Sequence, residues 1–264
     1  MSLQGEMKRR SPDGNLVADI RQFLEGQRDL FGDILLTEPR NNAKEPAVPP
    51  QKHVVDEPLL FEIPGPARPP ITMEPWGAAG TVDELNAQIC TCVKCPLGHT
   101  RTKFVFGVGN PHATLMLIGE APGADEDAQG EPFVGRAGQL LNKILEAINF
   151  KREEVYICNI LKCRPPGNRK PQSDEVEQCM PYLKKQIELI KPKVILCLGL
   201  TAAENLLNTT QSLGTLRGQV LRFEGTPVMI TYHPAALLRN PNWKRPTWED
   251  VQALRKLHDS LVAA

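Results

Sequence analysis

The stretch that decides the fold reads Thr114-Leu-Met-Leu-Ile-Gly119-Glu-Ala-Pro-Gly123, a short apolar run that ends in glycine and an acidic, proline-containing turn. An apolar run of this length, bounded by turn residues, is typical of a buried strand. Further strands are predicted outward from it at Val155–Leu161, Val194–Leu198 and Pro227–Thr231.

Segments with helical spacing of apolar residues lie between and beside these strands. They are predicted at Ala137–Phe150, Asp174–Ile190 and Thr201–Leu207, with a last helix capped by Thr247 and reaching about Leu261. Upstream, Thr81-Val-Asp-Glu84 matches the capping box of a helix start. Alternating strands and helices predict an α/β fold with a largely parallel sheet and helices on both faces. Ligands of such sheets bind beyond the carboxyl ends of the strands, so the loops after Gly119, Ile160, Leu198 and Thr231 are the places to search.

The composition limits the classes of function. The chain has 264 residues with 31 basic and 31 acidic side chains, so its formal net charge is zero. Charge alone therefore does not predict a nucleic-acid partner. We find no apolar run long enough for a membrane span and no secretory signal, which favours a cytoplasmic protein.

The chain divides near residue 80. Residues 1–80 form an N-terminal extension, with an amphipathic helix predicted at about 15–36 and then a proline-rich, flexible linker. That helix packs on the main domain as a lid or docks a partner protein, and the sequence favours neither. Residues 81–264 form the main domain.

Seven cysteines suggest a metal site, because disulfides are not expected in a reducing compartment. Cys92-x2-Cys95 is a chelating pair, and Cys163 and Cys179 form a second, widely spaced pair. Four thiolates suit zinc or an iron–sulfur cluster, and the wide second pair favours the cluster. Four buried, unligated thiols remain an alternative. Cys158 and Cys197 lie in strands and are expected in the core, whereas Cys90 competes with Cys92 as a ligand.

Several polar and aromatic residues stand at the predicted strand ends. Glu120 lies at a strand tip, Phe133 follows in a glycine- and proline-rich loop where it could stack a flat ligand, and Asn159 ends a strand. A fixed carboxamide can pair with the N3 donor and O4 acceptor of uracil, whereas cytosine presents the opposite pattern. Taken alone, Asn159 is more typical of a residue that ties down a loop, and His233 is by itself more typical of a structural histidine than of a donor to substrate.

Basic and apolar residues flank these positions. Lys162, Arg164, Arg169 and Lys170 surround Cys163, and Arg239, Lys244 and Arg245 follow Leu237 and Leu238. The basic residues suggest a track for phosphates, and the two leucines resemble an apolar wedge at a loop tip. An ordinary solvated loop is the alternative.

Taken together, these motifs resemble the family-4, iron–sulfur uracil-DNA glycosylases over about residues 81–264. The motifs that carry the resemblance are Gly119-Glu-Ala-Pro-Gly123 with Glu126-Asp127, Gly130-Glu-Pro-Phe-Val-Gly-Arg-Ala-Gly138, Asn159-Ile-Leu-Lys-Cys-Arg-Pro-Pro-Gly-Asn-Arg-Lys-Pro171, Cys179, and Tyr232-His-Pro-Ala-Ala-Leu-Leu-Arg239. The resemblance implies a three-layer α/β/α sandwich. It also implies a [4Fe-4S] cluster bound by Cys92, Cys95, Cys163 and Cys179.

The resemblance further implies a uracil pocket made by Glu120, Ala121, Pro122, Phe133, Asn159 and His233, with Glu120 and His233 as the catalytic residues. DNA contacts are expected from Lys162, Arg164, Arg169, Lys170, Leu237 and Arg239. The implied activity is that of a monofunctional glycosylase. It flips uracil out of single- or double-stranded DNA and cleaves its N-glycosidic bond, and Leu237 fills the gap. The protein is expected to be a monomer associated with DNA in a bacterial or archaeal cytoplasm.

Two other interpretations remain. A non-catalytic iron–sulfur protein could use the same pocket to sense uracil, in which case it would bind without releasing the base. A structural zinc protein with an unrelated ligand would lack the visible absorbance of a cluster. A covalent uracil trap is disfavoured, because Gly130–Gly138 lacks the basic insertion of the group that reacts in this way.

Overall fold

The structure is a computed structural model, and it describes residues 74–263. The expected helix at 15–36 and the proline-rich segment lie outside the described residues. The division of the chain near residue 80 therefore stays a prediction. None of the described helices is both long and apolar enough to cross a membrane.

In the described part of the chain, six strands form one mixed sheet in the order β1-β3-β2-β4-β6-β5. The strands are β1 Val108–Gly109, β2 Leu115–Gly119, β3 Tyr156–Asn159, β4 Val194–Leu198, β5 Leu221–Phe223 and β6 Thr226–Thr231. The four central strands are parallel, and the edge strands β1 and β5 are antiparallel to their neighbours. The predicted largely parallel sheet is thus confirmed. The two edge strands were not predicted, because they are too short to show a period.

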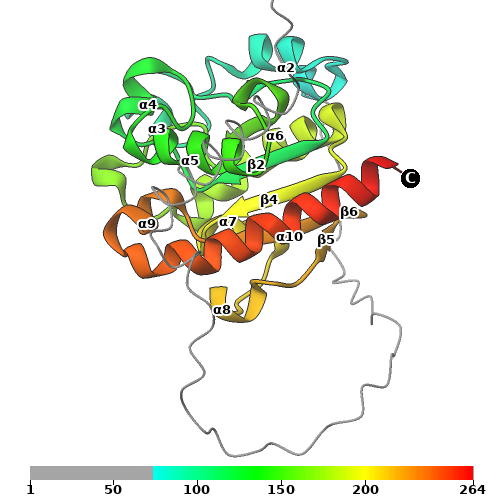
Figure 1. The fold of residues 1–264 in the computed structure, drawn as a ribbon. Helices are drawn as coiled ribbons and strands as arrows, with labels where there is room; N and C mark the ends of the chain where they lie inside the picture. The colour runs from blue at the N-terminus through cyan, green and yellow to red at the C-terminus, as the bar shows by residue number, and fades with distance from the viewer. Residues whose placement is uncertain (1–73, 264) are drawn as a thin grey trace, which may run out of the picture. The chain divides into compact units, whose positions relative to one another are not determined.

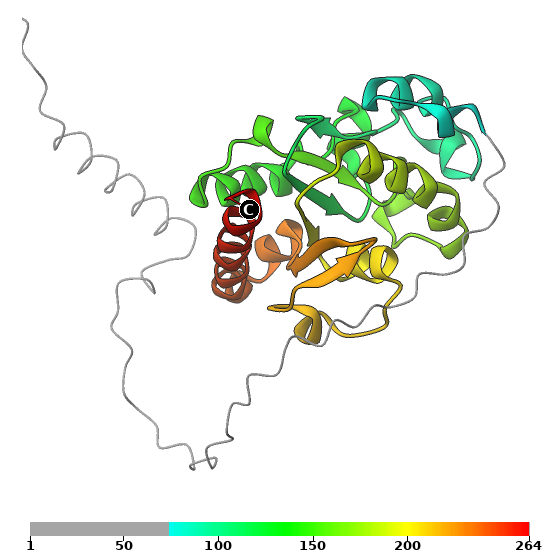
Figure 2. The same ribbon diagram turned by 90° about the vertical axis from the view of Figure 1, so that its right-hand side faces the viewer.

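Helices cover both faces of this sheet, as Figures 1 and 2 show. The helices are α2 Val82–Ile89, α3 Leu97–Thr100, α4 Ala124–Gln129, α5 Arg136–Ala147, α6 Ser173–Ile190, α7 Leu200–Leu207, α8 Leu213–Leu216, α9 Pro234–Arg239 and α10 Lys244–Ala263. One apolar core joins alternate strand residues such as Met116, Cys158 and Ile195 to α2, α6 and α7. The opposite strand faces pack against α5 and α10. The result is the expected α/β/α sandwich.

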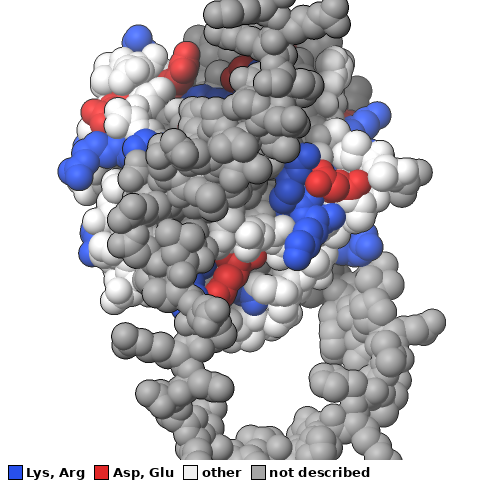
Figure 3. All heavy atoms as spheres, in the orientation of Figure 1, with Lys and Arg blue, Asp and Glu red and all other residues white. Residues whose placement is uncertain are grey.

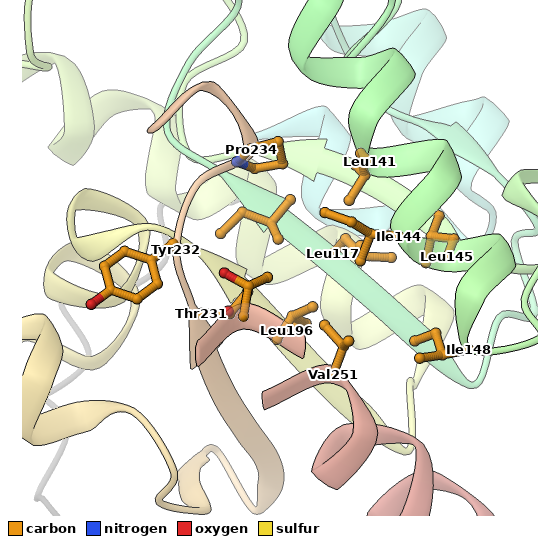
Figure 4. Close-up of a pocket in the computed structure, with 12 residues that line it drawn as sticks. Leu117, Leu141, Ile144, Leu145, Ile148, Leu196, Thr231, Tyr232, Pro234 and Val251 are labelled. Carbon is orange, nitrogen blue, oxygen red and sulfur yellow. The ribbon is translucent and has the colours of Figure 1, made fainter. Parts of the chain in front are cut away.

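The second core layer is tightly filled. Between the sheet and helices α5 and α10 lies a void of about 10 Å³, which is close to the space that a single water needs. Figure 4 shows the aliphatic side chains around it, among them Leu117 from β2, Leu196 from β4 and Val251 from α10. This space is part of the core and is too small for a ligand.

Capping explains where two of the helices begin. Thr81 accepts a hydrogen bond from the amide of Glu84 at 3.1 Å, so the predicted start of α2 is confirmed. The predicted cap of the last helix is wrong. Thr247 lies inside α10 and donates to the carbonyl of Trp243, because a 3₁₀ turn at Pro241–Trp243 leads directly into the helix at Lys244. The side chain of Asn240 caps that turn instead, by accepting from the amide of Asn242.

Candidate active site

A cavity of about 360 Å³ opens where β2, β3 and β6 end. Its lining comes from the loops that follow these strands and from α4, α5 and α9. The lining residues are Glu120, Ala121, Pro122, Gly123, Glu126, Phe133, Ala137, Asn159, Pro165, Asn168, Arg169, His233, Ala235 and Arg239. All six residues predicted to form the pocket are among them. The fold brings them together because the carboxyl ends of the parallel strands share one edge of the sheet.

Asn159 lies at the floor of this cavity with an unpaired acceptor. It is the last residue of β3, its side chain is 2% exposed, and it pairs in register with Gly119 of β2. Among the described residues, its Oδ1 is the single buried side-chain oxygen or nitrogen without a hydrogen-bond partner. A buried acceptor left unpaired costs about 1–3 kcal/mol, so this oxygen is suited to receive a donor from a ligand.

Glycine at position 119 makes this arrangement sterically feasible. A Cβ atom there would lie 2.4 Å from Oδ1 of Asn159 and 2.7 Å from Cζ of Phe133. Any larger residue would therefore displace both the amide and the aromatic ring. Gly119 is part of the pocket although it carries no functional group.

Phe133 is held in the cavity because the main chain of its loop is hydrogen-bonded to the side chains of Glu126 and Arg152. Its backbone is left-handed, with φ of 54°, and its side chain is 6% exposed. Glu126 accepts hydrogen bonds from the amides of Val134 and Gly135, both at 3.0 Å. Arg152 donates to the carbonyl of Pro132 at 2.6 Å, so the loop is fixed on both sides of the ring.

Glu126 is a functional residue whose individual role the sequence reasoning missed. Its second oxygen accepts from the amide of Gly123 at the start of α4, so one carboxylate joins the β2 loop to the Phe133 loop. The signal was present as Gly123-x-x-Glu126, which has the spacing of a helix cap. Sequence reasoning cannot show that the same carboxylate also reaches a loop eight residues further on.

His233 presents one defined tautomer to the cavity. Its Nδ1 accepts a hydrogen bond from the amide of Ala235 at 3.1 Å, so the ring proton of the neutral imidazole sits on Nε2. Burial, and secondarily the charge of Arg239, lower the pKa of His233 from 6.5 to about 4. The ring lies 5.4 Å from that of Phe133, centroid to centroid. At neutral pH this site therefore offers an uncharged N–H donor.

Of the five basic residues expected to contact DNA, four reach the protein surface and one is buried. Arg164, Arg169 and Lys170 lie on the loop after β3 and Arg239 lies at the end of α9, all at least partly exposed. Arg169 is bonded to Glu175, with Nη1 2.9 Å from Oε2, which offsets part of its charge. Figure 3 shows basic and acidic side chains interspersed over the described atoms visible in that view. A single continuous basic surface is not seen on them.

Two predicted DNA contacts are wrong. Lys162 is 0% exposed and bonds to Asn159 and Gln186, so it cannot reach a phosphate. Leu237 is 1% exposed, because it lies in helix α9 and not at a loop tip, and faces the protein interior. Its neighbour Leu238, 42% exposed, is the leucine of this helix that faces solvent.

The four cysteines predicted as ligands gather at one place. Cys163 and Cys179 are buried, Cys92 and Cys95 are half-buried, and the two buried thiols lie close enough to others of the group to interact with them. Burial raises the pKa of Cys163, and it raises the pKa of Cys179 to about 12, so these thiols stay protonated unless a metal displaces the proton. Cys90 is exposed and its Sγ contacts the carbonyl of Ala87.

The surroundings of these thiols suit metal-bound sulfur. Arg101 donates to Sγ of Cys163 at 3.2 Å, and the Tyr182 hydroxyl donates to Sγ of Cys92 at 3.3 Å. Such donors stabilise negative sulfur and tune a bound cluster. Within residues 74–263, no three His, Cys, Asp or Glu side chains are grouped closely enough to bind a single metal ion.

The fold and the site together define an α/β/α protein with a cavity at the carboxyl edge of its sheet, lined by an aromatic ring, a histidine and an amide whose oxygen is unpaired. Residues 106–257 match the family model described as the uracil DNA glycosylase superfamily. The chain is 43% identical to the type-4 uracil-DNA glycosylase of Archaeoglobus fulgidus, over 67% of this chain and 93% of that protein. It is 41% identical to the type-4 enzyme of Thermotoga maritima, over 64% of this chain and 90% of that protein.

A more distant relative is the type-5 uracil-DNA glycosylase of Pyrobaculum aerophilum, at 30% identity over 56% of this chain and 72% of that protein. The type-4 enzyme of the same organism is 45% identical, over 61% of this chain and 86% of that protein. The chain belongs to the uracil-DNA glycosylase superfamily and, within it, to the type-4 family.

Proposed function

We propose that this protein is a monofunctional uracil-DNA glycosylase that hydrolyses the N-glycosidic bond of uracil in DNA and leaves an abasic site for base excision repair. The family supports the activity. The observation that carries the assignment to this cavity is the unpaired, buried Oδ1 of Asn159. An orphaned acceptor in a cavity predicts a ligand with an N–H at that position.

Uracil supplies this donor and cytosine does not. The N3–H of uracil donates to Oδ1, and the amide nitrogen faces the O4 acceptor, whereas cytosine would place an acceptor against Oδ1. Phe133 stacks on the face of the base. Stacking and hydrogen bonding require the base outside the helix, so the nucleotide is flipped before cleavage.

His233 then stabilises the leaving group. As the glycosidic bond breaks, electrons move onto the uracil ring and its oxygens gain negative charge. The neutral Nε2–H of His233 donates to a uracil oxygen, which stabilises the charge that develops in the transition state. Glu120 also lines the cavity, and we assign it to orient the attacking water or to offset positive charge on the sugar.

Lysine is absent from the described residues that line the cavity, so this lining offers no amine for a Schiff base. This supports cleavage of the glycosidic bond without cleavage of the DNA strand. Arg164, Arg169, Lys170 and Arg239 bind phosphates beside the flipped nucleotide. Leu238, exposed on α9, replaces Leu237 as the side chain that fills the gap.

We assign a [4Fe-4S] cluster to Cys92, Cys95, Cys163 and Cys179. When bound, the cluster supplies cross-links between chain segments, since hydrolysis requires no electron. Cys163 lies just before the basic loop 164–170, so the ligands hold the start of that loop. The protein acts as a monomer on DNA in the cytoplasm, and the N-terminal segment is assigned to a lid or a protein partner.

A cleavage assay tests the function. A labelled oligonucleotide with one central uracil is incubated with the protein and then treated with alkali, beside cytosine and thymine controls. We expect strand breaks only at uracil, only after alkali, and over many turnovers. A protein that binds the uracil strand but releases no base would be a sensor, and the enzyme assignment would be wrong.

A further inference from the structure

Lys162 is a fully buried lysine between the candidate pocket and the cysteine group. It is 0% exposed, and its Nζ donates to the main-chain carbonyl of Asn159 at 2.8 Å and to Oε1 of Gln186 at 2.6 Å. An amino group is buried at a large cost unless it is hydrogen-bonded. These two acceptors therefore fix where the side chain lies.

Gln186 extends this contact into the core. It is itself 0% exposed, and its Nε2 donates to the carbonyl of Phe106 at 3.0 Å and to the hydroxyl of Tyr156 at 3.2 Å. It lies on α6, about two turns after Cys179. Gln186 thus connects Lys162 rigidly to the helix that carries one of the cysteines.

The main chain also connects Asn159 directly to one of the cysteines. Asn159 ends β3, and Cys163 follows four residues later, immediately after Lys162. The amide of Val105 donates to the carbonyl of Lys162 at 2.9 Å, which holds this short segment in place. The main-chain amide of Lys162 is also hydrogen-bonded to the thiol of Cys179. The base-reading residue and two cysteines therefore share one buried network.

We propose that Lys162 is a positioning residue, which fixes Asn159 against α6 and couples the uracil pocket to the segments that carry Cys163 and Cys179. The inference rests on the proposed function, because that function assigns Asn159 to uracil. The carbonyl that Lys162 binds belongs to the same residue whose amide faces the cavity. Loss of this anchor lets the amide move, and small displacements of a binding group are costly.

Two substitutions test the positioning role. Lys162→Met keeps most of the side-chain volume and removes both hydrogen bonds, whereas Gln186→Leu keeps the lysine and removes one of its acceptors. Lys256→Met, which changes an exposed lysine of α10, is the matched control. The full-length proteins are compared at equal cluster content, judged by visible absorbance, for inhibition by free uracil and for the ratio of kcat/KM on uracil and cytosine DNA.

We expect Lys162→Met to weaken inhibition by free uracil about tenfold, the effect of one or two lost hydrogen bonds, and to reduce discrimination against cytosine. Gln186→Leu should move both quantities in the same direction by a smaller factor, and Lys256→Met should move neither. A Lys162→Met protein with lower thermal stability but parental uracil affinity would overturn the proposal. If that variant does not fold, parental values for Gln186→Leu would overturn it.

The coupling between the uracil pocket and the cysteine group can be measured from the other side, because coupling between two sites is reciprocal. Bound uracil should then affect how firmly the cysteines hold the cluster. Loss of the visible absorbance is followed after addition of an iron chelator, with and without saturating uracil. Uracil should slow this loss in the parent protein and in Lys256→Met, and the effect should disappear in Lys162→Met. Equal slowing in Lys162→Met would overturn the coupling. If the parent itself neither binds nor releases uracil, the proposed function fails, which is a separate outcome.

Discussion

Single atoms decide what this pocket can recognise. Oδ1 of Asn159 is buried without a partner, and Nε2 of His233 carries a proton because its Nδ1 is already an acceptor. One residue thus offers an acceptor and the other a donor, both without net charge at neutral pH. A neutral base with both an N–H and a carbonyl oxygen is complementary to this pair.

Replacing Asn159 tests the acceptor. We expect Asn159→Ala to lower kcat/KM on uracil DNA by about 10²–10³-fold, because the base loses its aligned partner in a desolvated site. Steady-state cleavage of a uracil oligonucleotide measures this. Asn205→Ala removes an amide of α7 that bonds locally to Thr201, and should keep parental activity. Parental cleavage by Asn159→Ala would show that the pocket is assigned wrongly.

The lowered pKa of His233 predicts how stability depends on pH. The folded state disfavours protonation, so between about pH 6.5 and 4 the unfolded chain binds more protons than the folded one. His233 therefore contributes full stability above pH 6.5, and this is lost as the pH falls through 4. Relative to His233→Gln, the parent should lose on the order of 2 kcal/mol more in unfolding free energy over this range.

Urea titrations of both proteins at several pH values give this comparison. A difference between them that does not vary with pH would contradict the lowered pKa.

At the level of elements, the pocket depends on close contacts between loops and helices. The Phe133 loop lies directly against α5, because Gly138 leaves no Cβ between them. The side chain proposed to fill the gap in the DNA lies on α9. There Leu237 is buried, whereas its neighbour Leu238 is exposed to solvent. Helical geometry points neighbouring side chains about 100° apart, so one leucine can be buried while the next is exposed.

Gly138→Ala should damage the site through its main chain. The added Cβ would overlap the carbonyl oxygen of Phe133, so the loop must shift and the ring leaves its stacking position. We expect a loss of about 1–3 kcal/mol in unfolding free energy and a fall in kcat. Gly214→Ala, in α8 with its nearest neighbour at 3.9 Å, should be close to neutral. Equal effects of the two substitutions in thermal unfolding would argue against this packing.

Leu238→Ala should slow cleavage of duplex DNA more than cleavage of single strands, because only the duplex needs the gap filled. Leu237→Ala should instead lower thermal stability, since it removes a buried side chain. Parallel assays on matched single- and double-stranded oligonucleotides separate the two. A duplex-specific defect in Leu237→Ala alone would restore the original prediction for that residue.

Across the whole molecule, the cysteine group joins parts of the chain that are far apart in sequence. Cys92 and Cys95 follow α2, Cys163 follows β3, and Cys179 lies within α6. A cluster bound to all four would link three segments around one face of the sandwich. Protein ligands that meet only in the folded state make metal binding part of the folding free energy.

Cys163→Ala should therefore lose visible absorbance and lower both the yield of folded protein and the melting temperature. Cys90→Ala should keep the colour, because Cys90 is exposed and stands outside the group. Absorption spectra and iron analysis of the purified variants provide the measurement. A coloured Cys163→Ala protein, or a colourless Cys90→Ala protein, would require a different ligand set.

The sequence by itself determined the succession of the central strands and helices along the chain and six of the residues that line the pocket. Apolar runs and helical periodicity are local signals, and the carboxyl ends of parallel strands must share one edge. It did not determine that Lys162 and Leu237 are buried, that β1 and β5 pair antiparallel at the edges, or that Glu126 joins two loops. Those features depend on contacts between segments distant in sequence, such as Lys162 with Gln186, and no local pattern encodes them. Burial is a property of the packed molecule, so only the tertiary structure decided which basic residues are exposed and which one is buried beside the pocket.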